Sequence, residues 1–332
     1  MFKPDAIYYE PNIQNYVLGK QLLDKYSDTP KFEIKNHNNI PEMRNQENSQ
    51  FPVLKKHLII ATRKTHKYTE NHKVSDFLVP YTSSGCTAMC LYCYLVCNYN
   101  KCAYLRLFVN REEMLNKIIK ISEKSDKELT FEIGSNSDLI LENSITNNLV
   151  WTIENFAKSK KGFLPFPTKF DMVEPILNLN GKENILIRLR VIPEKFINKI
   201  ELGTSSLKNR IEAINKLSDV GYRVGILIAP IILTDHWQQL YKELIIPLFE
   251  SLNEKAKSNL FFELIFMTYS YIHKMINTEA FPNAIDLYNP ELMASRGYGK
   301  YCYKKEIRSQ AEQYLLELLN KYFPKNKIWY VS

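Results

Sequence analysis

A regular alternation of short apolar runs with amphipathic stretches most constrains the fold of this 332-residue chain. The apolar runs are typical of buried strands and span residues 57–61, 77–81, 104–109, 129–133, 163–166, 185–191, 224–229, 260–266 and 328–331. The amphipathic stretches predict helices, of which the clearest span residues 112–122, 145–156, 207–217, 237–252 and 305–322. Such alternation predicts a parallel sheet covered by helices. A right-handed succession of this length predicts an α/β barrel or partial barrel.

The first part of the chain differs from the rest. Residues 1–56 are polar and mixed, and residues 36–50 are rich in Asn and Glu, which is typical of a loop or irregular arm. We therefore expect an N-terminal extension, residues 1–56, that packs on a barrel formed by residues 57–332.

Composition places the chain among soluble globular proteins, with 45% hydrophobic and 24% charged residues. No apolar run is long enough to span a membrane, and the N-terminus lacks the apolar segment of a secretory signal. The sequence therefore predicts a cytoplasmic protein. A net charge of +8 fits either a polyanionic partner or a lysine-rich surface, and charge alone does not decide between them.

Five of the six cysteines lie between Cys86 and Cys102, which suits a site better than a disulfide scaffold. Cys86, Cys90 and Cys93 have the spacing C-x3-C-x2-C and follow the strand at 77–81, at the end where reactive groups gather in such folds. Three thiolates can hold three irons of a [4Fe–4S] cluster and leave the fourth iron open. The alternatives are a zinc site, which normally needs a fourth nearby ligand, and buried structural thiols.

The cysteine spacing, with Tyr92 before the last cysteine, resembles the signature of radical S-adenosylmethionine (SAM) enzymes. Further motifs in order along the chain resemble the spore photoproduct lyase family; they are residues 8–11, 62–65, 104–110, 131–138, 167–170, 203–206, 228–230, 262–265 and 299–303. The abundance of Lys and Asn is compatible with a clostridial-type member.

The resemblance implies a partial (β/α)6 barrel of the TIM-like radical SAM type, with a C-terminal basic–aromatic hairpin. It also implies a [4Fe–4S] cluster and SAM as cofactors. The activity it implies is DNA repair: a 5′-deoxyadenosyl radical abstracts a hydrogen atom from the spore photoproduct, a methylene-bridged thymine dimer, and two thymines are restored. The alternatives are a radical SAM enzyme acting on another nucleic acid and a damage-binding protein with impaired catalysis.

The resemblance assigns cofactor roles to particular residues. Cys86, Cys90 and Cys93 would bind the cluster, and its open iron would chelate SAM. The residues expected near SAM are Tyr92, Gly134, Ser137, Lys169 and Arg190. Each has an alternative: Ser137 could cap the next helix, Lys169 could be a surface lysine, and Arg190, which stands where a small hydroxyl residue is typical, could be a strand-end charge.

Tyr92 and Tyr94 flank the third cysteine and correspond to the radical relay of the family, with simple packing as the alternative. Ser135 stands where the best-known members have the cysteine that returns a hydrogen atom to the product. An alcohol O–H bond is too strong for that role. We therefore hypothesise that Cys97 replaces the missing donor; a chance or buried thiol is the alternative for Cys97 and Cys102.

A basic and aromatic group near the C-terminus predicts the lesion-binding hairpin; its members are Arg296, Tyr298, Lys300 and Tyr301, beside Gly297 and Gly299. A glycine-containing turn with solvated side chains is the alternative. The expected partners are double-stranded DNA carrying the photoproduct and a reductant such as flavodoxin or ferredoxin. We expect a monomer without membrane contact, in the cytoplasm of the germinating spore.

Overall fold

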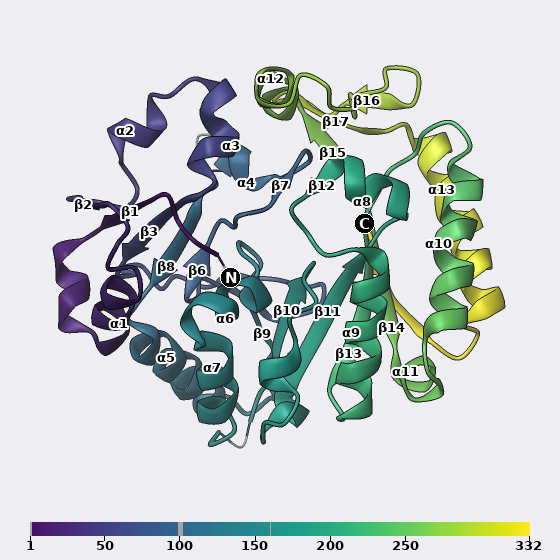
Figure 1. Ribbon diagram of the computed structural model, residues 1–332. Helices are drawn as coiled ribbons and strands as arrows, with labels where there is room; N and C mark the ends of the chain where they lie inside the picture. Colours follow the sequence, from purple (N-terminus) through teal and green to yellow (C-terminus); the bar gives the residue numbers. More distant parts are fainter. Residues whose placement is uncertain (1, 99–101, 160) are drawn as a thin grey trace.

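A row of parallel strands forms the body of this computed structural model, which describes residues 2–98, 102–159 and 161–332 (Figure 1). In spatial order the strands are β5 (Phe77–Val79), β9 (Phe131–Ile133), β10 (Leu164–Thr168), β11 (Ile185–Val191), β13 (Arg223–Ile231) and β14 (Phe261–Phe266). A parallel bridge between Thr130 and Phe163 joins β9 to β10, and β18 (Lys327–Val331) extends the row beyond β14. The predicted α/β fold, a partial barrel of the (β/α)6 type, is confirmed.

Helices cover the outside of this row of strands (Figure 1). They are α5 (Arg111–Lys124), α6 (Leu139–Thr146), α7 (Asn148–Phe156), α8 (Glu194–Ile200), α9 (Leu207–Asp219), α10 (Trp237–Ser251), α11 (Glu254–Asn259) and α13 (Lys305–Tyr322). The stretch 145–156, expected as one helix, is divided between α6 and α7. Asn147 adopts left-handed backbone angles there (φ 58°), which end one helix and begin the next. Among the described residues, no helix is long and apolar enough to cross a membrane.

The N-terminal segment builds a second sheet. Its strands, in order, are β2 (Lys31–Glu33), β1 (Ala6–Tyr9), β3 (His57–Ala61), β8 (Leu105–Phe108) and β6 (Ser83–Ser84). The same segment carries α1 (Val17–Lys25), α2 (Pro41–Arg44) and α3 (Phe51–Leu54). Because β1 pairs in parallel with β3, the expected division at residue 56 falls inside a shared sheet, and that division stays a prediction.

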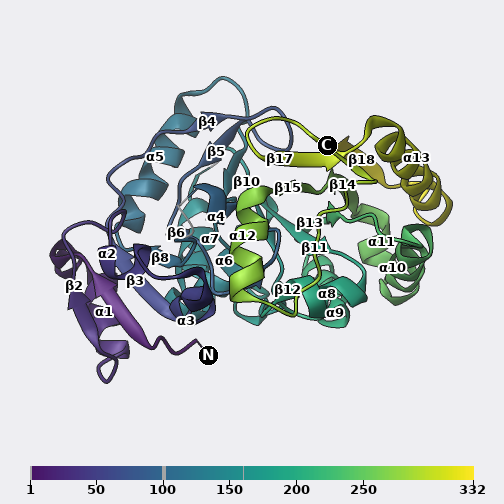
Figure 2. The ribbon, with the colours of Figure 1, turned by 90° about the horizontal axis from the view of Figure 1, so that it is seen from above.

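Short elements gather beyond the carboxyl ends of the barrel strands, the end that Figure 2 views from above. They are β7 (Met89–Cys90), α4 (Leu95–Asn98), β12 (Glu201–Leu202), β15 (Thr268–Ser270), α12 (Tyr271–Ala280), β16 (Met293–Ser295) and β17 (Lys300–Tyr303). β7 pairs with β12, so the cysteine loop is joined to the segment after α8. β16 and β17 form an antiparallel hairpin that also pairs with β15. A further short strand, β4 (Thr69–Glu70), pairs with β5.

A buried charged cluster crosses the interior of the barrel. Arg188 of β11 forms ion pairs with Glu132 of β9 (2.6 Å) and Glu263 of β14 (3.2 Å). Neither β9 nor β14 is adjacent to β11, so these contacts form across the interior. Because side chains alternate along a strand, Arg190 points to the same side as Arg188, nearer the carboxyl end. Ile187, on the opposite face, is fully buried beneath the helix layer.

Candidate active site

A cavity of about 290 Å³ opens at the carboxyl ends of the barrel strands. It brings together the three motif cysteines with most of the other predicted catalytic and cofactor-binding residues, namely Tyr92, Tyr94, Ser135, Ser137, Lys169 and Arg190. These residues come from the cysteine loop and from the ends of β9, β10 and β11. The barrel thus collects at one place residues that are about a hundred positions apart in the chain.

Gly85 and Gly134 form sharp turns next to residues that line the cavity. Gly85 precedes the first cysteine with φ 70°, and a Cβ atom there would lie 2.1 Å from the carbonyl oxygen of Tyr104. The Gly85 N–H donates a hydrogen bond to the Asn136 carbonyl at 2.7 Å, which links the cysteine loop to the loop after β9. Gly134, predicted near the cofactor, has φ 77° and shapes the turn that presents Ser135 and the residues after it.

Helix α12, which the sequence analysis missed, holds the cysteine loop from above. Asn277 donates a hydrogen bond to the carbonyl of Leu91 at 2.7 Å, and His273 Nε2 lies 3.0 Å from the carbonyl of Cys93. The Ser270 N–H donates to Nδ1 of His273, so Nε2 carries the proton and donates to Cys93. Burial lowers the pKa of His273 to about 4, which keeps the ring neutral and this tautomer fixed.

The three motif thiols, Cys86, Cys90 and Cys93, line the same cavity. Burial raises the pKa of Cys86 against the opposing charge of Lys55, and it raises the pKa of Cys90 against the opposing charge of Lys169. Within the described ranges, no three His, Cys, Asp or Glu side chains converge on one point that could hold a metal ion. A [4Fe–4S] cluster does not need such convergence, because each thiolate binds a different iron. The three thiols line one cavity and so supply the donor set that a [4Fe–4S] cluster would need.

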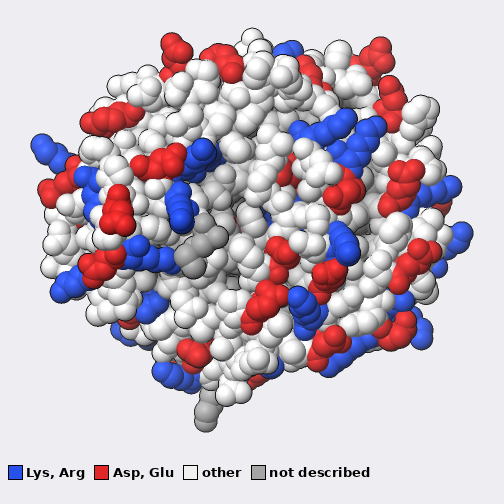
Figure 3. Space-filling model, in the orientation of Figure 1, with Lys and Arg blue, Asp and Glu red and all other residues white. Residues whose placement is uncertain are grey.

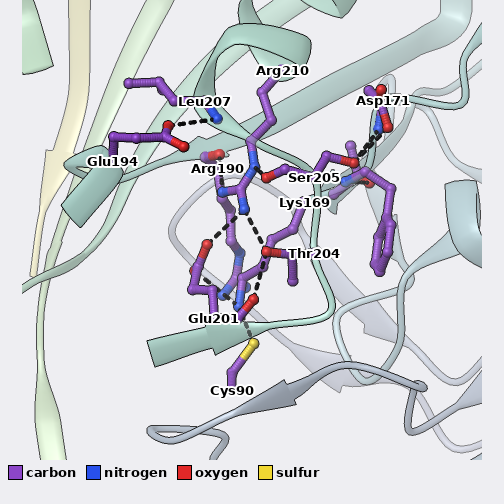
Figure 4. Close-up of polar contacts among 12 residues, drawn as sticks. Cys90, Lys169, Asp171, Arg190, Glu194, Glu201, Thr204, Ser205, Leu207 and Arg210 are labelled. Atoms are coloured by element: carbon purple, nitrogen blue, oxygen red, sulfur yellow. Dashed lines mark hydrogen bonds and ion pairs between the residues drawn. The ribbon is translucent and has the colours of Figure 1, made fainter. Parts of the chain in front are cut away.

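Lys169 belongs to a buried polar hub rather than to the surface (Figure 4). Its Nζ lies 3.2 Å from Cys90 Sγ and 3.3 Å from Glu201 Oε1. Arg210 of α9 binds Oε2 of the same Glu201 at 2.7 Å, and both side chains are fully buried. The phenol of Tyr92 donates a hydrogen bond to Glu201 as well. The surface alternative for Lys169 is therefore wrong.

The charge of Glu201 orients the side chains of this polar hub, which consists of Lys169, Arg210, Tyr92 and Glu201 itself. Burial alone would raise the pKa of Glu201, but the Lys169 and Arg210 charges and the hydrogen bonds from Tyr92 and Arg210 outweigh it and lower the pKa to about 2. Glu201 therefore stays ionised and fixes both the ammonium of Lys169 and the ring of Tyr92. Sequence analysis missed Glu201 and Arg210, because no local spacing relates either residue to Lys169.

Ser137 does not cap helix α6. The N-cap is Asp138, whose side chain accepts a hydrogen bond from the Leu141 N–H at 3.2 Å. The hydroxyl of Ser137 lies 2.8 Å from that of Ser83, which in turn lies 2.5 Å from the buried carboxyl of Glu142. Ser83 has one hydroxyl proton to donate to either Ser137 or Glu142, and burial raises the pKa of the Glu142 carboxyl. The Ser137 side chain also lines the cavity, where its oxygen can accept a further hydrogen bond.

Arg190 lines the cavity with a guanidinium that no protein carboxylate neutralises among the residues the structure describes. Its backbone carbonyl accepts a hydrogen bond from Arg210 at 2.9 Å, which fixes the end of β11. The side chain can therefore receive an anionic group, and the strand-end surface alternative is not favoured.

Tyr94 and Ser135 meet at the mouth of the cavity. The Tyr94 phenol donates a 2.5 Å hydrogen bond to the Ser135 carbonyl and lies 3.2 Å from Oδ1 of Asn136. Tyr94 is 44% exposed, so it also faces the opening through which a substrate would enter.

The structure does not bring Cys97 or Cys102 to the cavity. The Cys97 thiol faces α12, where it lies 3.3 Å from the Ser270 hydroxyl, and Cys102 is buried in an apolar cluster with Tyr104. The prediction that Cys97 replaces the missing hydrogen donor therefore has no geometric support. Short α4 turns its thiol away from the cavity, although the residue is only four positions from Cys93.

The hairpin residues lie outside the cavity, at the tip of β16 and β17. Tyr298 is fully exposed with left-handed backbone angles (φ 52°), and Arg296 and Lys300 flank it in solvent. Tyr301 packs against Tyr288, with ring centroids 4.7 Å apart, so its ring is less available than that of Tyr298 to contact DNA. On the face in Figure 3, Lys and Arg are interspersed with Asp and Glu, so the net positive charge is not concentrated there.

The full-length matches to known proteins belong to one family. The spore photoproduct lyase family model matches residues 2–332. The chain is 30% identical to spore photoproduct lyase of Bacillus subtilis over all of this chain and 99% of the relative. It is 26% identical to that of Clostridium acetobutylicum over 98% of both chains. A solved spore photoproduct lyase variant with bound AdoMet and dinucleoside spore photoproduct superposes with a TM-score of 0.92 at 27% identity, covering 100% of this chain and 99% of the other.

Proposed function

Because the chain belongs to the spore photoproduct lyase family, we propose that it is the radical SAM lyase that reverts the spore photoproduct in DNA to two thymines. The observation that carries the proposal is the cavity that joins the three motif cysteines to the acceptor, cationic and phenol groups of Ser137, Lys169, Arg190 and Tyr94. A fold alone would not assign the activity, but this set of groups matches the chemistry.

Each cavity residue has a distinct task in this proposal. Cys86, Cys90 and Cys93 would hold a [4Fe–4S] cluster that, with SAM, supplies the 5′-deoxyadenosyl radical when bound. Arg190 would pair with the carboxylate of SAM, and the oxygen of Ser137 would receive a hydrogen bond from its amino group or ribose. Glu201 holds Lys169 and Tyr92 at the thiol side of the cavity.

Tyr94 is the residue we propose to return a hydrogen atom to the thymine, since Ser135 has no thiol and the Tyr92 phenol is held by Glu201. The phenoxyl radical left on Tyr94 would be restored by one electron from the reductant and one proton from solvent. A phenol proton exchanges with solvent, so repair in D2O places deuterium in a restored thymine. Tyr94→Phe removes that label and increases the share of radical by-products, measured by chromatography and mass spectrometry. Adding Ser135→Cys to Tyr94→Phe restores clean, labelled product. A label that survives Tyr94→Phe alone excludes Tyr94 as the donor.

The hairpin would insert at the lesion, because a dimer must leave the base stack before chemistry can reach it. Tyr298→Ala is expected to weaken binding of lesion-containing duplex by about 1–3 kcal/mol, roughly 5- to 150-fold in Kd. Arg296→Ala and Lys300→Ala should each make the slope of log K against log salt concentration less steep, by the amount expected for the loss of about one phosphate contact. Fluorescence anisotropy over a salt series measures both. Phe32→Ala, an exposed aromatic on the N-terminal sheet, is the control and leaves binding unchanged.

The remaining assignments are parts of the same proposal. A flavodoxin or ferredoxin would supply the electron, and the enzyme would act as a monomer in the cytoplasm of the germinating spore. The Lys- and Asn-rich composition supports a clostridial-type member, although the identity to the clostridial relative is no higher than to the Bacillus one.

One reconstitution experiment separates the proposal from its rivals. The protein is loaded anaerobically with iron and sulfide, reduced, and incubated with SAM and dinucleoside spore photoproduct. We expect 5′-deoxyadenosine formation together with repaired dinucleotide. Cleavage of SAM without repair would indicate another nucleic-acid substrate, and tight binding of the photoproduct without cleavage would indicate a damage-binding protein.

A further inference from the structure

Lys55 is a buried lysine that contacts the cysteine loop from the N-terminal segment. It follows α3 and is 3% exposed. Its Nζ donates hydrogen bonds of 2.8 Å to the carbonyls of Cys86, the first motif cysteine, and Ala103. Its charge also lies 5.3 Å from the ring centroid of Phe51. Throughout residues 2–98, 102–159 and 161–332, no carboxylate forms an ion pair with it.

A buried cation with only carbonyl partners is energetically unfavourable, because dipoles replace part of its hydration and supply no opposite charge. Two other buried cations, Arg188 and Arg210, do have carboxylate partners. The negative charge that Lys55 lacks would be supplied beside Cys86. A [4Fe–4S] cluster on three thiolates is anionic, and it gains a further negative charge on reduction.

We propose that Lys55 is a counter-charge of the iron–sulfur cluster that favours its reduced state. The reduction potential of an iron–sulfur cluster depends on its net charge and on the hydrogen bonds and burial around the sulfurs. A fixed buried cation stabilises the reduced cluster, because that state is the more negative one. Lys55 touches no reacting atom, so it is a positioning and tuning residue. The inference rests on the proposed function, because it requires the cluster. It also assigns a role in the site to the segment before residue 57.

A purely structural role makes a different prediction. If Lys55 only tied the Cys86 and Ala103 loops together, Lys55→Met would destabilise the cluster-free protein. As a counter-charge without its anion, Lys55 costs stability in the cluster-free protein. Lys55→Met should then unfold at the same or a higher temperature than wild type before loading.

The test is a spectroelectrochemical titration of the reconstituted protein without SAM, on wild type, Lys55→Met, Lys55→Arg and Lys56→Met. Lys56 is the exposed neighbour and serves as the matched control. At the wild-type midpoint, Lys55→Met should lower the ratio of reduced to oxidised cluster about tenfold, which is about 59 mV for one electron. Lys55→Arg and Lys56→Met should stay near wild type.

Two results overturn the inference: a fully loaded Lys55→Met with an unchanged midpoint, or a cluster-free Lys55→Met with a clearly lower melting temperature. If Lys55→Met takes up no iron, cluster loading of Lys55→Gln is compared with that of Lys55→Arg to test the charge effect. Loading of Lys55→Arg but not Lys55→Gln supports a charge effect, and failure of both contradicts it. If wild type itself binds no four-iron cluster, the proposed function fails, whatever the Lys55 variants do.

Discussion

Glu201→Gln lowers the free energy of unfolding of the cluster-free protein by about 3–5 kcal/mol. The substitution removes the only charge on a side chain that binds Arg210 at 2.7 Å and Lys169 at 3.3 Å, and it leaves the fully buried Arg210 guanidinium without its carboxylate partner. A buried cation that loses its partner suffers the desolvation cost without the compensating attraction. The same change releases the Tyr92 phenol from its acceptor.

Glu174→Gln is the matched control for this prediction. Glu174 pairs with Lys216 at the same 2.7 Å distance, but about half of each side chain is exposed. Water screens such a pair, so its loss should cost about 0–1 kcal/mol. Urea unfolding of both variants measures the difference. Equal and small losses would mean that the Glu201 hub does not carry the stability assigned to it.

The pH dependence of unfolding gives an independent check on Glu201. Its pKa is lowered from 4.5 in the unfolded chain to about 2 in the fold, so the unfolded state binds more protons between these values. The stability from this group is fully present above pH 4.5 and is lost as the pH falls through about 2. In the Glu201→Gln variant, the free energy of unfolding should therefore fall less steeply than in wild type as the pH decreases from 4.5 to about 2.

The sequence predicted those features that depend on local pattern. The alternation of apolar runs and helices located nearly every barrel strand, and the spacing of Cys86, Cys90 and Cys93 lies within one short loop. A glycine such as Gly85 is also readable locally, because the turn it makes belongs to the same loop.

Features that depend on contacts between distant segments could not be read in this way. Glu201 meets Cys90 only because β12 pairs with β7, and Lys55 meets Cys86 only because the N-terminal sheet lies beside the cysteine loop. Cys97 is the converse case: nearness in sequence to the cluster motif suggested nearness in space, but its thiol lies 3.3 Å from the Ser270 hydroxyl and does not line the cavity.

Cys90→Ala abolishes cofactor chemistry while Cys97→Ala leaves it intact, and this pair tests the assignment of the thiols most directly. Cys90 lines the cavity, pairs its strand with β12, and receives the Lys169 ammonium at 3.2 Å. Loss of outer partners of a metal site typically costs 10- to 100-fold in affinity or activity, so loss of a direct ligand should exceed about 100-fold. Iron content and 5′-deoxyadenosine formation after identical reconstitution measure it.

Cys97→Ala is a matched control, because Cys97 is the same residue type as Cys90 at a different position. Both are partly buried thiols within one short segment of chain. If the cavity geometry is right, Cys97→Ala keeps the iron content, the yield of repaired dinucleotide and the by-product fraction of wild type, because its thiol contacts α12. A rise in by-products with an intact cluster would instead return Cys97 to the reaction as the hydrogen donor, and would remove that role from Tyr94.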